Sequence, residues 1–88
     1  CHQPDGPGNA TIDLRHHVPL DATGLVDAAP AQGELGLRDP RQIAPGDPGR
    51  SMLLHRVRTL GAGRMPPIGS LRVDEDAVAL IEAWIESL

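Results

Sequence analysis

The density of glycine and proline is the feature that most limits the fold of this 88-residue chain. Ten glycines and nine prolines are present, and most of them precede residue 50. Each of these residues interrupts a regular helix or strand. We therefore expect a single domain spanning residues 1–88, with extended, ordered loops in its first half and regular helices only in its second.

The material for a core is scarce. The chain has one aromatic side chain, Trp84, and a single cysteine, which excludes an internal disulfide. Domains this small usually compensate for a thin core with a disulfide, a metal, a cofactor or a partner. We expect Met52 and Trp84 in the core, and a cofactor or a larger parent protein to complete it.

Two helices are predicted in the second half of the chain. In "GDPGRSMLLHRVRTLG", Asp47 is the expected cap and Pro48 the first helical residue, with Gly61 ending the run. In "RVDEDAVALIEAWIESL", Asp74 is the expected cap. The apolar residues of this second segment recur at helical spacing and form one stripe: Val78, Ile81, Trp84, Ile85 and Leu88.

Two short strands are predicted in the first half. Residues 10–15, "ATIDLR", alternate apolar and polar side chains, and residues 41–45, "RQIAP", offer a possible partner. The fold class is thus mostly α, with a short β-hairpin or extended insertion before two C-terminal helices.

The charge of the chain excludes some classes of function. The formal net charge is −4 and no basic run is present, which argues against a nucleic-acid partner. No stretch is long and apolar enough for a transmembrane span. The sequence contains no nucleophile–base pattern and no phosphate-binding glycine motif, so nothing in it indicates an enzyme.

A stiff loop holds one methionine between the two predicted helices. In "GRMPP", the prolines at positions 66 and 67 fix the backbone and donate no hydrogen bonds, so Met65 is held in one place. Methionine is the most flexible apolar side chain, and rigid presentation suggests that its sulfur has a role.

The chain begins with Cys1 and His2. A c-type haem is attached through C-x-x-C-H, in which the histidine binds the iron, and a methionine sulfur commonly takes the opposite axial position. If the chain is a piece cut from a longer protein, as we expect, Cys1 is the second cysteine of that motif. His2 is then the proximal ligand.

The chain resembles the C-terminal haem-binding, cytochrome c-like domain of bacterial, planctomycete-type secreted oxidoreductases. The matching segments are "CHQPDGPG", "IAPGDPGRSMLLHRV", "GRMPP" and "VDEDAVALIEAWI". The first cysteine of the motif and the helix that carries it are not in the chain. The resemblance implies Cys1 as a thioether attachment, His2 as proximal ligand and Met65 as distal ligand.

The same resemblance implies one-electron transfer, without catalysis by protein groups, in the periplasm or outside the cell. A redox partner protein or an attached dehydrogenase domain would supply or accept the electron. Arg64, next to Met65, is a candidate to pair with a haem propionate, because arginine binds carboxylates in a forked geometry.

Other interpretations of the same residues remain open. Cys1 is alternatively the acylated first residue of a secreted lipoprotein, and the chain then is an anchoring or interaction domain. Cysteine and histidine side chains also suggest a zinc site, drawn from Cys1, His2, His16, His17 and His55, although their spacing matches no known zinc pattern. His55 is also an alternative distal ligand to Met65.

Overall fold

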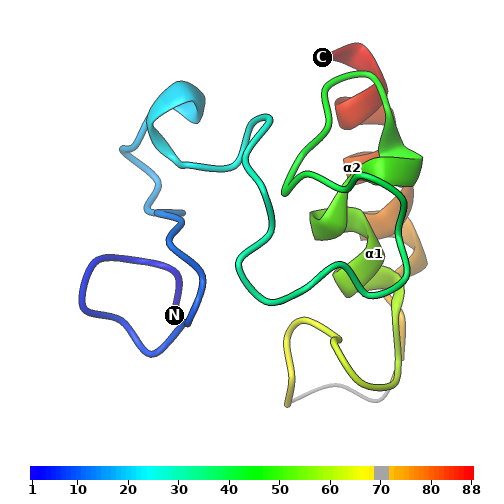
Figure 1. The fold of residues 1–88 in the computed structure, drawn as a ribbon, viewed down its shortest axis with the longest axis horizontal. Helices are drawn as coiled ribbons and strands as arrows, with labels where there is room; N and C mark the ends of the chain where they lie inside the picture. Colours follow the sequence, from blue (N-terminus) through cyan, green and yellow to red (C-terminus); the bar gives the residue numbers. More distant parts are fainter. Residues whose placement is uncertain (69–71) are drawn as a thin grey trace.

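The computed structural model describes residues 1–68 and 72–88 and is mostly α. In chain order it contains two short 3₁₀ helices, η1 (Leu20–Ala22) and η2 (Pro48–Arg50), and two α-helices, α1 (Met52–Arg58) and α2 (Glu75–Ser87). No strand occurs in the described residues, where extended segments take its place. Figure 1 shows α1 and α2 on one side of the molecule, and the N-terminal loops with η1 on the other.

Helix α2 begins where its sequence predicts. The Asp74 side chain accepts a hydrogen bond from the backbone N–H of Ala77 at 3.0 Å, and Glu75 and Asp76 lie in the first turn. A carboxylate cap and acidic residues at this end stabilise the partial positive charge of the helix N-terminus. The predicted cap is therefore confirmed.

Helix α1 is shorter than predicted. Asp47 does not cap it, because residues 48–50 form the separate helix η2 and Ser51 has extended backbone angles. The Ser51 hydroxyl oxygen accepts a hydrogen bond from the Ala44 N–H at 2.9 Å and donates one to the Asp47 carbonyl at 3.0 Å. These bonds hold Ser51 outside the helical conformation, so α1 begins only at Met52.

The predicted strands at residues 10–15 and 41–45 do not form a hairpin. Instead, Ile43 makes a parallel bridge with Val26, and Arg41 makes a parallel bridge with Ser51. Residues beside these bridges, Asp27 and Asp39, adopt positive φ angles of 56° and 47°. Left-handed residues turn the chain, so neither bridge extends into a strand.

The core lies where the two α-helices meet the middle of the chain. Met52 is fully buried, as predicted. The main cluster contains Leu25, Ile43, Leu54, Val78 and Ile85, with further apolar side chains partly buried around it. Leu25 and Ile43 come from the loop-rich half, so the extended segments contribute directly to the core.

Trp84 is not part of that core, contrary to the sequence prediction. Its side chain remains 37% exposed, and Leu88 from the same predicted stripe is 42% exposed. Successive helical residues are separated by about 100° around the axis. Because Val78 and Ile85 face the core, Trp84 is turned toward the surface.

Replacing Ser51 with alanine tests the junction before α1. Ser51→Ala removes the acceptor of the buried Ala44 N–H, which costs about 1–3 kcal/mol of unfolding free energy. Denaturant unfolding followed by Trp84 fluorescence measures the loss. Ser87→Ala is the matched control: the Ser87 hydroxyl is exposed, and its removal should change stability by less than about 0.5 kcal/mol. Equal stability of the two variants would contradict this role.

Candidate functional site

The first eight residues form a closed loop around Cys1 and His2. The Cys1 carbonyl accepts hydrogen bonds from the N–H groups of Gln3 at 3.1 Å and Gly8 at 3.2 Å, and Gly6 donates to the Gln3 carbonyl at 3.0 Å. The loop is visible at the N-terminal end of the ribbon in Figure 1. The Cys1 thiol is free and exposed, so a covalent partner can reach it.

Two glycines allow this loop to close. A Cβ atom on Gly8 would lie 2.8 Å from His2 Nδ1, and a Cβ atom on Gly6 would overlap the Cys1 carbonyl oxygen. The imidazole of His2 therefore packs directly on the Gly8 backbone. The role of Gly6 and Gly8 in closing the loop was not predicted, although two glycines soon after His2 in "CHQPDGPG" are a signal of a tightly closed turn.

Among the described residues, no hydrogen bond holds the His2 ring. Its Nδ1 atom is buried and has no partner among the described residues. A buried ring nitrogen without a partner is unfavourable in a purely structural histidine. The backbone of His2 is well held by comparison, since its carbonyl accepts a hydrogen bond from the Leu14 N–H at 2.8 Å.

A charged pair flanks Leu14. Arg15 donates from Nε and Nη2 to the Asp13 carboxylate, with the shortest bond at 2.7 Å. The hydrogen bond from Arg15 lowers the pKa of Asp13, and the same bond raises the pKa of Arg15. Both groups stay charged at neutral pH, so this pair supports the extended segment beside the Cys1–His2 loop.

The loop that carries Met65 is attached to α1 through Arg56. The Arg56 carbonyl accepts a hydrogen bond from the Met65 N–H at 3.0 Å, and Arg56 Nη1 donates to the Gly63 carbonyl at 2.8 Å. Gly63 has a φ angle of +88°, which favours glycine. The fixed position predicted for Met65 thus depends on Arg56 as well as on the prolines. The sequence did not reveal the hydrogen bonds of Arg56 to this loop.

Met65 and Arg64 line one pocket of about 220 Å³ against α1 and α2. Its apolar wall is formed mainly by Val57, Met65, Pro66, Ala77, Val78 and Ile81, and its polar part by Arg64, Arg72 and Asp74. Arg64 Nε is buried there and has no hydrogen-bond partner among the described residues. A cationic donor beside an apolar wall suits a ligand with a flat apolar body and a carboxylate.

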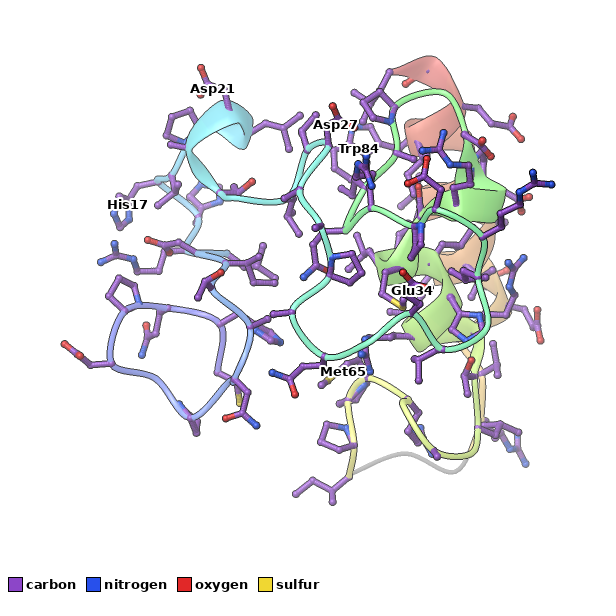
Figure 2. The ribbon with its side chains drawn as sticks, viewed as in Figure 1. His17, Asp21, Asp27, Glu34, Met65 and Trp84 are labelled. Atoms are coloured by element: carbon purple, nitrogen blue, oxygen red, sulfur yellow. The ribbon has the colours of Figure 1, made fainter. Side chains whose placement is uncertain are left out.

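The structure brings the predicted site residues together only in part. Arg64 and Met65 share the pocket, whereas Cys1 and His2 lie in the N-terminal loop. Within residues 1–68 and 72–88, no hydrogen bond or ion pair joins these two loops. In Figure 2, Met65 lies below the helices, separate from the N-terminal loop.

The histidines and the cysteine proposed for a zinc site do not gather in the described residues. The part of the chain that the structure describes contains no group of three histidine, cysteine or acidic residues that could hold a metal ion. Figure 2 shows His17 at the outer edge of the molecule. His55 lies in α1 and is not among the residues that line the Met65 pocket.

Comparison with protein-family models, with curated proteins and with solved structures finds no match to this chain. Among the residues that the structure describes, no helix is long and apolar enough to cross a membrane. The resemblance to cytochrome c-like domains therefore remains a prediction from the residues themselves.

Gly8→Ala tests the packing of His2. The new methyl group would occupy the space of His2 Nδ1, so the ring must move, and the NMR chemical shifts of the His2 ring protons should change. His2→Gln assigns those signals. Gly61→Ala is the control, because no atom lies within 4 Å of the added Cβ. Unchanged His2 signals in Gly8→Ala would contradict the arrangement.

Proposed function

We propose that this chain is an electron-transfer domain that holds a c-type haem through Cys1, His2, Met65 and Arg64. The mostly α architecture agrees with this proposal, and the cytochrome c-like nature of the fold is part of it. A bound c-type haem supplies a one-electron ferric–ferrous couple, whose potential depends on axial ligands and burial.

One observation carries the proposal. In the described part of the chain, the buried side-chain nitrogens without a hydrogen-bond partner belong to His2 and Arg64. Both residues were assigned to the haem from the sequence alone. A protein rarely leaves a buried polar group unpaired. A haem carboxylate in the Met65 pocket would accept a hydrogen bond from Arg64 Nε, and because His2 Nδ1 packs on Gly8, Nε2 is the ring nitrogen left to bind iron.

Each residue has a separate task in this proposal. The exposed Cys1 thiol forms the covalent attachment. His2 offers Nε2, its other ring nitrogen, because Nδ1 packs against Gly8, and this packing holds the ring in place. Met65 presents its sulfur from the stiff loop, and a thioether ligand favours a higher reduction potential. Arg64 pairs with a carboxylate substituent.

The size of the pocket limits how much of the cofactor it covers. Pockets that enclose drug-sized ligands measure about 300–1,000 Å³, and the Met65 pocket measures about 220 Å³. It therefore accepts one edge of a porphyrin. The remaining cover must come from the N-terminal loop, from an attached dehydrogenase domain or from a redox partner, in the periplasmic or exported setting that the resemblance implies.

The lipoprotein alternative uses the same thiol in another way. An exposed Cys1 is also accessible to acylation, and the chain would then anchor a secreted protein. This interpretation gives no role to the unpaired side-chain nitrogen of Arg64. Cys1→Ser separates the two: it removes membrane association in the lipoprotein, but it removes only covalent attachment, not axial ligation, in the haem domain.

Met65→Ala tests the proposed axial ligand. The reduced chain, incubated with haem under conditions for thioether formation, should give a low-spin spectrum with a weak far-red sulfur-to-iron band. Met65→Ala should lose that band and lower the reduction potential, because a sulfur ligand is replaced by a harder donor. Met52→Leu is the control, since Met52 is the other methionine of the chain and is fully buried.

Three results would count against the proposal. If the chain takes up no haem, the electron-transfer role fails. If haem binds but Met65→Ala keeps the far-red band, Met65 is not the ligand. If His2→Ala leaves the spectrum unchanged, the assignment of the proximal ligand is wrong.

A further inference from the structure

The last turn of α1 is bonded to the residues that follow it. The carbonyl groups at the C-terminal end of a helix have no N–H partner within the helix. In α1 the Thr59 hydroxyl donates to the His55 carbonyl at 2.6 Å, and the Met65 N–H donates to the Arg56 carbonyl at 3.0 Å. The backbone of Met65 therefore completes the end of this helix.

The side chain of Arg56 makes a second bond to the same loop. Its Nη1 atom donates to the Gly63 carbonyl at 2.8 Å. A hydrogen bond from a charged donor is among the stronger kinds. Each ion pair of the described residues uses an arginine other than Arg56, so the bond to Gly63 is not shared with a carboxylate there. Arg56 thus holds the loop at two points, Gly63 and Met65.

Gly63 lies against side chains from two different segments. Its φ angle of +88° is one that glycine adopts readily. A Cβ atom placed on Gly63 would lie 2.7 Å from Leu35 Cδ1 and 3.5 Å from Arg56 Nη1. Arg56 and the middle of the chain therefore both restrict the loop two residues before Met65.

Arg56 does not line the Met65 pocket, but its neighbour Val57 does. Helix α1 thus supplies part of the pocket wall through Val57, while Arg56 bonds the loop that supplies Met65. A loop bonded to Arg56 is fixed relative to that wall. Arg56 can therefore act on the pocket only through the loop, without contact with a bound ligand.

We propose that Arg56 is the positioning residue for Met65, and that its two hydrogen bonds determine how firmly the sulfur is presented to the pocket. The two prolines after Met65 restrict the backbone on one side, and Arg56 restricts it on the other. A side chain that is held in advance loses less freedom when it binds. The use of this sulfur as an iron ligand rests on the proposed function, whereas the hydrogen bonds of Arg56 do not.

Amide hydrogen exchange of the haem-free chain tests the hold on Met65. Arg56→Met removes the donor to Gly63, so the loop should open more often and the Met65 amide should exchange about tenfold faster. Ile43→Val is the control, because Ile43 is fully buried in the core and its truncation lowers the overall stability. It should leave the Met65 amide unchanged, since the loop can open while the core stays folded.

The haem-loaded chain tests what this hold does for the sulfur. Imidazole competes with Met65 for the axial position, so the loss of the far-red band during a titration with imidazole measures the hold. Arg56→Met should lose the band at about tenfold lower imidazole concentration. Arg56→Lys keeps a cationic donor and should fall between. Arg58→Met, which removes the same charge from an exposed arginine in the same turn, should match the unsubstituted chain.

The outcomes separate positioning from other roles. Equal acceleration of the Met65 amide by Ile43→Val and Arg56→Met would mean that the loop is not held separately from the core, and the proposal fails. Equal titrations of Arg58→Met and Arg56→Met would assign the effect to charge. An unchanged titration after faster exchange would also overturn the proposal, because Arg56 would then order the loop without serving the sulfur. If the unsubstituted chain takes up no haem, the proposed function fails, and the exchange rates decide whether Arg56 positions Met65.

Discussion

The hydrogen bonds of the Ser51 hydroxyl are the interaction on which the positions of α1 and the Met65 loop depend. It is fully buried and ties Ala44 and Asp47 to the residue immediately before α1. These bonds fix where α1 begins and therefore where Arg56 lies along it. Arg56 in turn holds Gly63 and Met65 through its side chain and its carbonyl. A contact between Ser51 and Ala44, seven residues apart in the chain, thus helps to position the loop that carries Met65.

Sequence patterns predicted the structure wherever the decisive contacts are local. The Asp74 cap and its acidic neighbours are bonded within one turn, so α2 begins as predicted. The start of α1 was misplaced because the partner of Ser51, Ala44, belongs to a preceding loop. The hairpin did not form because both segments bond elsewhere: the N–H groups of Asp13 and Leu14 donate to the carbonyls of Thr23 and His2, and Ile43 bridges to Val26.

In the candidate site, too, some features follow from the local sequence and others depend on contacts between distant residues. The stiffness of the Met65 loop follows from its prolines, and the pairing of Arg64 with Met65 in one pocket agrees with their adjacency in sequence. The burial of Arg64 Nε arises from tertiary contacts, which residue types do not reveal, whereas the packing of His2 on Gly8 has a local signal in the glycines that follow His2. Residue types therefore indicated a candidate chemistry and the burial of Met52, but not the burial of the Arg64 side-chain nitrogen.

Helix α2 explains how so small a domain uses its few apolar residues. Val78 and Ile85 build the core, and Ala77 and Ile81 line the Met65 pocket. Leu80, Trp84 and Leu88 remain exposed. With one aromatic residue, the chain has few apolar side chains to fill the Met65 pocket itself, so a ligand bound there would add stability to the fold.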